Sequence, residues 1–363
     1  MSSGPLRYER EQVLRGHTGG VLAVSFSGDG KFIATAGSDC LVCIWRVDGG
    51  LLLHTATFQE PVLSLAWIPR EGNCVACGNQ DGSISTLVIK QNILGLKGTW
   101  AHACPVERLA VENVARGRIA SGAHHELFIW SIRRGGKWVR EVSLQRPSDS
   151  LYSKDHTVIV TSIHWMPAKS TLLATFMYHG IVMFSSQDWT ILRAFPLNST
   201  IVDASVRPDL ARIVLSNATS GFDIYDLDSG SPEAFLPAGP GACRAVPVLF
   251  IHGGNALLSG STTGQVALWD VDRRRRHHTL LHADDEVVLA IAAHYLEPSD
   301  RFLVATGVMG GAARGSVFVW KAEGMARVPP RWTTRFTFFA VSLIGTIICL
   351  GVALRYAQSL YIL

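Results

Sequence analysis

The sequence predicts an all-β fold, a seven-bladed β-propeller of four-stranded antiparallel blades, followed by one C-terminal transmembrane α-helix. Three observations predict this fold class. A unit with a period of about 40–45 residues recurs through residues 1–322. Each unit alternates apolar and polar residues with the two-residue period of β-strands. An uncharged apolar stretch then lies close to the end of the chain.

The repeat is clearest in the aromatic or apolar residue that closes each unit. Successive closing residues lie 41 to 54 residues apart, which is typical of propeller blades of which two carry insertions. The closing residues are Trp45, Leu87, Trp130, Phe184, Tyr225, Trp269 and Trp320. Seven such units predict seven blades.

The best-preserved unit runs from Gly16 to Trp45 and reads GHTGGVLAVSFSGDGKFIATAGSDCLVCIW. Its two alternating apolar segments predict strands, and the glycine-rich triplets at 28–30 and 37–39 predict the turns between them. The opening Gly-His pair and the closing Trp resemble the WD-repeat family, as does the dipeptide Trp269-Asp270. The resemblance covers residues 1–322, nearly 90% of the chain, although most other units have lost the Gly-His pair.

This resemblance implies a role for the polar residues of the first unit. In the family, a His, a hydroxyl residue, an Asp and the Trp form a buried chain of hydrogen bonds inside the blade. The corresponding residues are His17, Thr35, Asp39 and Trp45. Each needs a partner, because an unpaired buried polar group costs about 1–3 kcal/mol. Fragments of the same pattern are His102, His156 and Ser259.

Two chemical interpretations compete with this structural one. His17, Asp39 and a nearby serine could form a hydrolase triad, but the G-x-S-x-G turn is missing. The pairs Cys40-x-x-Cys43 and Cys74-x-x-Cys77 could bind zinc, but residues i and i+3 of a strand point to opposite faces. The sequence also has no P-loop and no HExxH motif. We therefore expect no catalytic, cofactor or metal site, and a protein that is not an enzyme.

The apolar stretch 336–354 contains 19 residues and no charge. As a helix it would be about 28 Å long, close to the roughly 30 Å of a hydrocarbon core. Three arginines precede it between residues 327 and 335, and only Arg355 follows, so the positive-inside rule places the propeller in the cytosol. Because nine residues remain after the stretch, we expect a single-pass tail anchor in an endomembrane, the endoplasmic reticulum, with a lumenal C-terminus.

These features divide the chain into four parts. Residues 1–322 form the propeller, 323–335 a basic, proline-containing linker, 336–354 the transmembrane helix and 355–363 a short tail. Residues 7–14 precede the first unit, and we expect them to supply the outer strand of blade seven. That pairing would close the ring and remove an open sheet edge.

Turns between the second and third strands should gather on one face, where propellers bind peptides or proteins. The candidate partner face contains Ser38, Gln80, Asp81, His124, His125, Tyr178, Thr263 and Arg314. A second candidate surface is the basic run Arg273, Arg274, Arg275 and Arg276, between a third and a fourth strand at the opposite rim. That run is open to three interpretations: a solvated loop, a contact with anionic lipid, or a nuclear import signal.

The repeats, the anchor and the missing catalytic motifs predict a membrane-anchored scaffold that recruits a cytosolic protein or peptide. A net charge of +4 is too mild to predict a nucleic-acid partner. The alternative is a small-GTPase regulator, because a propeller with one C-terminal span resembles the exchange factor that starts vesicle budding at the endoplasmic reticulum. That family carries a glycine-rich, lysine-containing loop in its first blade. The similar segment here, 307–315, lies in blade seven and has Arg314 instead of lysine.

Overall fold

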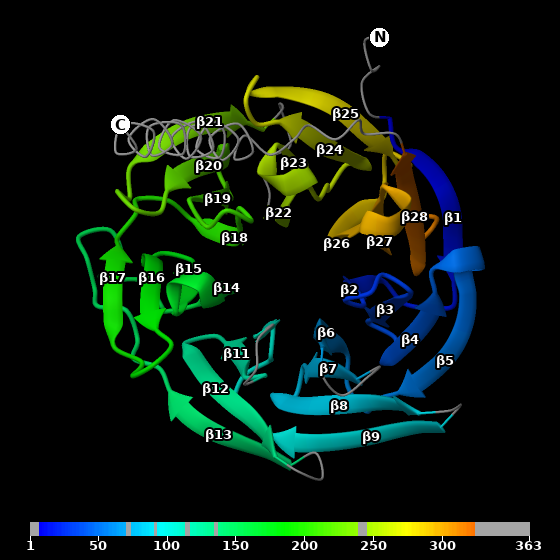
Figure 1. Cartoon of the computed structure of the whole chain (residues 1–363), viewed down its shortest axis with the longest axis horizontal. Coiled ribbons are helices and arrows are strands. Elements are labelled where there is room, and N and C mark those ends of the chain that lie inside the picture. Colours follow the sequence, from blue (N-terminus) through cyan, green and yellow to red (C-terminus); the bar gives the residue numbers. More distant parts are fainter. Residues whose placement is uncertain are drawn as a thin grey trace, which may run out of the picture. The chain divides into compact units, whose positions relative to one another are not determined.

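The computed structural model describes residues 7–69, 74–90, 93–112, 117–133, 137–238 and 245–323. These residues form seven four-stranded antiparallel sheets arranged around a common centre (Figure 1). The predicted all-β, seven-bladed fold is therefore confirmed. Residue 323 ends the last strand, whereas the predicted remainder of the linker, the transmembrane helix and the tail lie outside the described residues. No helix within the ranges above is long and apolar enough to cross a membrane.

We number the blades in chain order of their innermost strands. Blade one contains β2 (Val21–Phe26), β3 (Phe32–Gly37), β4 (Leu41–Arg46) and β5 (Leu51–Thr57), and blade two contains β6 (Val62–Ile68), β7 (Cys74–Asn79), β8 (Ser83–Lys90) and β9 (Ile93–Trp100). Blade three contains β10 (Arg108–Val111), β11 (Ile119–Ala123), β12 (Glu126–Arg133) and β13 (Lys137–Ser143), and blade four contains β14 (Val160–Met166), β15 (Thr171–Phe176), β16 (Gly180–Ser185) and β17 (Ile191–Phe195). Blade five contains β18 (Ile201–Val206), β19 (Arg212–Asn217), β20 (Gly221–Asp226) and β21 (Pro232–Pro237), and blade six contains β22 (Val248–Ile251), β23 (Ala256–Ser259), β24 (Gln265–Asp270) and β25 (Arg275–Leu281). Blade seven contains β26 (Val287–Leu296), β27 (Arg301–Gly310), β28 (Ser316–Glu323) and β1 (Glu9–Arg15). Short 3-10 turns are η1 (Asp48–Gly50), η2 (Pro167–Lys169), η3 (His252–Gly254) and η4 (Glu297–Ser299).

The ring closes through the N-terminal strand. β1 pairs antiparallel with β28, from Glu9 opposite Lys321 to Arg15 opposite Ser316, and so supplies the outer strand of blade seven. Tyr8, just before β1, extends this contact to blade six, because its hydroxyl donates to His252 Nε2 at 2.9 Å. The first and the last strands of the propeller therefore belong to one sheet.

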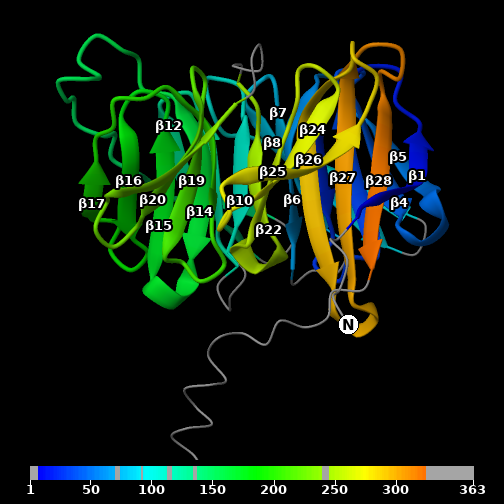
Figure 2. The same ribbon diagram turned by 90° about the horizontal axis from the view of Figure 1, so that it is seen from above.

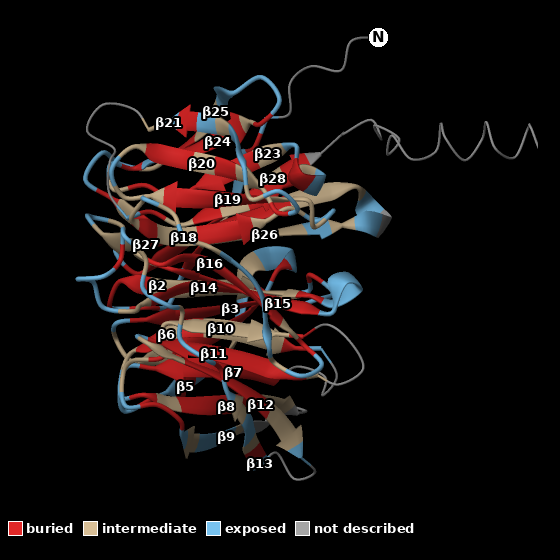
Figure 3. Cartoon of the chain, turned by 90° about the vertical axis from the view of Figure 1, so that its left-hand side faces the viewer, coloured by how far each residue is buried: buried red, intermediate tan, exposed pale blue. Residues whose placement is uncertain are grey.

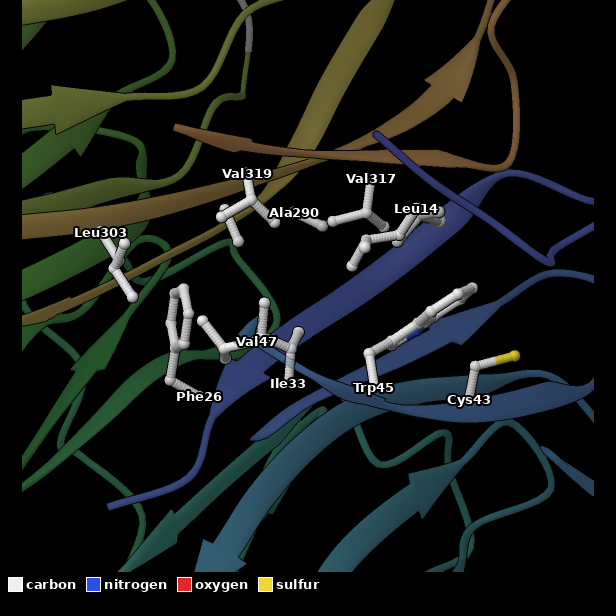
Figure 4. Packing of buried hydrophobic residues seen from close by; sticks show 12 residues of the cluster. Leu14, Phe26, Ile33, Cys43, Trp45, Val47, Ala290, Leu303, Val317 and Val319 are labelled. Atoms are coloured by element: carbon white, nitrogen blue, oxygen red, sulfur yellow. The ribbon is translucent and has the colours of Figure 1, made fainter. Parts of the chain in front are cut away.

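Apolar side chains fill the space between the closing blade and blade one (Figure 4). Leu14 of β1 and Val317 of β28 belong to the same buried cluster as Trp45 and Cys43 of β4. Leu14 is only 2% exposed. The closing strand is thus held by packing as well as by its backbone pairing.

Burial decreases from the second strand of a blade to the fourth (Figure 3). Every residue of β7, β11 and β15 is buried, because these strands have neighbours in the sheet and neighbouring blades over both faces. Their sequences are accordingly runs of small and apolar residues. Outer strands such as β17 are mostly exposed. Turns from second to third strands lie on one face of the disc, which we call the upper face, and Figure 2 shows the disc edge-on.

Candidate functional site

The predicted tetrad of blade one lies together inside the blade. Thr35, in the middle of β3, accepts the indole N–H of Trp45 at 2.9 Å and lies 2.8 Å from Nε2 of His17. Nδ1 of His17 is 3.1 Å from the Asp39 carboxylate. A carboxylate only accepts hydrogen bonds, so the tautomer with its proton on Nδ1 satisfies all four groups. The hydroxyl of Thr35 then donates to Nε2.

Both nitrogens of the His17 ring are therefore engaged, and the ring side chain is fully buried. A general base needs a free nitrogen within reach of a substrate proton. Burial alone would raise the pKa of Asp39, but hydrogen bonds from His17 and from the Thr18 backbone N–H outweigh it and hold the pKa below its usual value. The arrangement is suited to holding a loop and a strand together, and it offers no nucleophile to a hydrolase triad.

Blade three contains a second tetrad that the sequence reasoning found only in part. The sequence predicts His102 as a fragment of the pattern, and the structure places Ser121, Glu126 and Trp130 with it. Ser121 accepts the Trp130 indole N–H at 2.7 Å and lies 2.6 Å from His102 Nε2, and Nδ1 of His102 is 2.9 Å from Glu126. Burial lowers the pKa of His102, and Glu126 opposes that shift only partly. In blade three, Glu126 occupies the position beside the histidine that Asp39 occupies in blade one.

Blade seven has a third, rearranged tetrad that the sequence reasoning missed. Trp320 donates its indole N–H to Thr306 at 2.8 Å, and the Thr306 hydroxyl lies 3.2 Å from Nε2 of His282. The acid, Glu286, lies 3.4 Å from His282 Nδ1 and follows that histidine by four residues. In blade one the acid lies in the turn between the second and third strands, and in blade three it is the first residue of the third strand, β12. In blade seven the preceding loop supplies it instead.

The four cysteines of the two CxxC pairs lie in or beside buried strands. Cys43, Cys74 and Cys77 are buried, and Cys40 is partly buried in the turn before β4. Burial raises the pKa of Cys43 to about 11 and that of Cys77 still higher, so both thiols stay protonated at neutral pH. Zinc binds thiolates, and these environments disfavour the thiolate. Among the described residues, no group of three His, Cys, Asp or Glu side chains could hold a metal ion.

The eight residues of the candidate partner face all lie in turns between second and third strands. They come from six turns, one in every blade except blade five: Ser38 after β3, Gln80 and Asp81 after β7, His124 and His125 after β11, Tyr178 after β15, Thr263 after β23, and Arg314 after β27. The structure thus gathers residues from six blades on the upper face. Of the segment 307–315, the first four residues belong to β27, and only 311–315 form the turn.

Several of these side chains have local roles. Ser38 accepts the Gly20 N–H at 3.0 Å, and the Asp81 carboxylate accepts the Ser83 N–H at 2.9 Å. Tyr178 stacks on the ring of His156 with a centroid distance of 4.0 Å. Within the described ranges, four of these side chains form no hydrogen bond or ion pair: Gln80, His124, His125 and Arg314. These four are the groups most available to a partner.

The basic run lies on the face opposite the candidate partner face. Arg273 and Arg274 lie in the turn between β24 and β25, whereas Arg275 and Arg276, expected between the two strands, are the first residues of β25. Three of its arginines have partners: Arg273 lies 3.7 Å from Asp270, and Arg274 donates to the Glu233 carbonyl oxygen at 3.1 Å. Arg276 lies 3.4 Å from Gln265 Oε1. Only Asp270 offsets part of the positive charge that the run can present to an anionic surface, because the other two acceptors are neutral.

Comparison with known proteins agrees with this geometry. The sequence model of the family "WD domain, G-beta repeat" matches residues 8–46. A WD repeat-containing protein, the WDS homolog of Arabidopsis thaliana, is 40% identical over 77 residues, which is 20% of this chain and 15% of that protein. The ribosome biogenesis protein BOP1 homolog of the same plant is 21% identical over 312 residues, 78% of this chain and 35% of that protein.

A third relative is the target of rapamycin complex subunit wat1 of Schizosaccharomyces pombe, 26% identical over 124 residues, 34% of this chain and 36% of that protein. The chain spans between 15% and 36% of the length of these curated relatives. The matched segment 8–46 contains β1 and most of blade one, including the first tetrad. The seven four-stranded blades make this chain a seven-bladed β-propeller, and its residues 8–46 are similar to the WD-repeat family.

Proposed function

We propose that this protein is a non-enzymatic platform that recruits a cytosolic protein or peptide to an endomembrane, that of the endoplasmic reticulum. WD40 propellers bind protein partners on their face and are generally non-enzymatic scaffolds. The observation that carries the proposal is how the polar residues are used. The buried His, Thr, Ser and acidic groups of blades one, three and seven bond to one another within a blade, which leaves the exposed turns of the upper face for recognition.

Membrane attachment is the second part of the proposal, and its support is the sequence alone. The uncharged stretch 336–354 has the length of a membrane span, and its flanking arginines favour a cytosolic propeller. The strand β28 ends at Glu323, so a linker of twelve residues, 324–335, would separate the disc from the bilayer. The run Arg273 to Arg276 is the surface that we propose to contact anionic lipid headgroups.

A charge-changing variant of the upper face tests the recruitment. We would combine Gln80→Arg, His125→Glu and Arg314→Glu in the full chain, because these side chains hold no turn together. The matched control changes three exposed residues of the opposite face: Lys31→Glu, Lys137→Glu and Glu297→Arg. Proximity labelling in cells should recover the same cytosolic proteins with the wild type and the control and lose them with the upper-face variant. Equal recovery by both variants would contradict the proposal.

Two further measurements address the membrane and the alternative function. Deleting residues 336–363 should release the protein from the membrane fraction, and protease protection should place the propeller in the cytosol. If the full-length protein accelerated nucleotide exchange on a small GTPase, and Arg314→Glu abolished that activity, regulation of the GTPase would replace passive recruitment as the function.

A further inference from the structure

One connection of the propeller is much longer than the others. Residues 144–159 join β13 of blade three to β14 of blade four. The corresponding connections elsewhere run only over 16–20, 58–61, 101–107, 196–200, 238–247 and 282–286. The connection emerges on the upper face, and Figure 2 shows it, in green, extending beyond the neighbouring turns. An insertion of this size at one blade junction requires a reason.

Both ends of the connection are fixed to the upper face. The N–H of Leu144 donates to the Leu127 carbonyl oxygen at 2.8 Å, and the N–H of Val160 donates to the His124 carbonyl oxygen at 2.8 Å. Further along, the ring of His156 stacks on Tyr178, and the Asp149 carboxylate lies 3.5 Å from His179. The connection therefore rests on the turns of blades three and four.

The tip of the connection is a tight turn around a buried serine. Ser153 is fully buried. Its hydroxyl accepts the Ser150 N–H at 2.9 Å, and its own N–H donates to the Ser150 carbonyl oxygen at 3.2 Å. The His156 N–H donates to the Ser153 carbonyl oxygen at 2.9 Å. These bonds fix the backbone on both sides of residues 151 and 152.

The two residues that this turn presents to solvent are apolar. Leu151 is 97% exposed and Tyr152 is 50% exposed. A loop that served only as a connection would gain nothing from holding a leucine away from every neighbour, because burying an apolar side chain is favourable. An ordered, convex apolar tip is complementary to a hollow on another molecule.

We propose that residues 144–159 form a docking finger that inserts Leu151, flanked by Tyr152, into an apolar pocket on the surface of a folded protein partner. The finger carries two basic residues, Arg146 and Lys154, and two acidic ones, Asp149 and Asp155. This balanced charge favours a protein pocket over an anionic membrane, which attracts clusters of basic residues. The inference rests on the proposed function, since it names the part of the upper face that engages the recruited protein.

Site-specific crosslinking in the full-length protein locates the contact. A photoreactive amino acid replaces Leu151 in one variant and Leu281, a leucine of β25 that is 68% exposed, in the control. If residues 144–159 dock on a partner, the probe at position 151 should give a discrete protein adduct, and the probe at position 281 should not give it. An adduct of position 151 with lipid alone, or with a second copy of this chain alone, would overturn the proposal.

Binding of the crosslinked protein, purified, then measures the contribution of the tip. Leu151→Asp should weaken binding by about tenfold to hundredfold, the range expected for one buried leucine, and Leu281→Asp should leave it unchanged. Both variants should unfold at the wild-type temperature, because neither side chain is buried. Leu151→Asp could bind as tightly as the wild type while the triple upper-face variant does not bind. That result would contradict docking through residues 144–159 and would leave the proposed recruitment by the upper face intact. If neither the wild type nor any variant bound a protein, both proposals would be contradicted.

Discussion

At the scale of single residues, three blades place a carboxylate beside a buried histidine by different routes. Asp39 lies in the turn after the second strand and Glu126 begins the third strand, whereas Glu286 comes from the loop that also carries its histidine. What is common to them is a carboxylate beside Nδ1 of a buried ring. The physical requirement is a paired donor inside a packed sheet, and any nearby segment that can supply an acceptor meets it.

Replacing Asp39 by Ala should lower the free energy of unfolding by about 1–3 kcal/mol. The change leaves Nδ1 of the buried His17 and the Thr18 N–H, which donates to this carboxylate at 2.7 Å, without their acceptor. Denaturant titration of the full-length protein measures the loss. Asp284→Ala, at an exposed acid of the upper face, is the control and should have no effect. An Asp39→Ala protein as stable as the wild type would show that the tetrad is not structural.

At the scale of strands and turns, a buried ion pair of blade three contacts blade four on the lower face. Arg118, before β11, donates to both oxygens of Glu112 at 2.8 and 2.9 Å and to the Ser186 carbonyl oxygen at 2.7 Å. Its guanidinium carbon lies 5.1 and 4.9 Å from the ring centres of Trp165 and Trp189. Arginine suits such a site because its planar group can stack and donate at once.

Replacing Arg118 by Ala should cost about 3–5 kcal/mol of stability, because the buried Glu112 carboxylate loses the charge that compensates it. Arg118 is 6% exposed and Glu112 is 4% exposed, so water cannot replace the lost partner without local rearrangement. The double variant Arg118→Met with Glu112→Gln removes both charges and should recover a substantial part of the loss. Thermal unfolding distinguishes the two. A single variant no less stable than the double variant would contradict the ion-pair explanation.

At the scale of the whole propeller, stability depends on how the ring is closed. β1 is distant in sequence from β28 but pairs with it along its length, and Tyr8 continues the contact to His252 of blade six. Burial lowers the pKa of His252 to about 4, so its ring is neutral at physiological pH and Nε2 can accept a hydrogen bond from the Tyr8 hydroxyl. Closure joins the two ends of the propeller unit, 7–322, into one compact ring.

Deleting residues 1–15 should open this ring. The edge of β28 would then present unpaired N–H and carbonyl groups, a known cause of edge-to-edge association. We expect a lower melting temperature and light scattering that grows with protein concentration. Deletion of residues 1–6 alone is the control, since it leaves β1 and Tyr8 in place. A protein that lacks residues 1–15 but melts as the wild type would show that β1 does not hold the ring closed.

The sequence predicts the first tetrad but only fragments of the other two. The number of residues between the histidine and the tryptophan of each blade explains the difference. His17 precedes Trp45 by 28 residues, and His102 precedes Trp130 by the same number, so the second tetrad was within reach of sequence inspection. His282 precedes Trp320 by 38 residues, because β26 and β27 are each ten residues long. The longer hairpin shifts the hydroxyl residue, and the acid moves to a different segment. No fixed spacing could have predicted Glu286.

The periodicity of the sequence alone determined the number of blades, their strands and the face on which the variable turns gather. Those features follow from local alternation, turn residues and the repeat length, each of which acts over a few neighbouring positions. The tertiary structure decided which acid pairs with His282, that Arg118 lies over two tryptophan rings, and that Leu151 stays in solvent at the tip of a fixed turn. These depend on segments far apart in the chain, or on the absence of neighbours, and no local pattern specifies either.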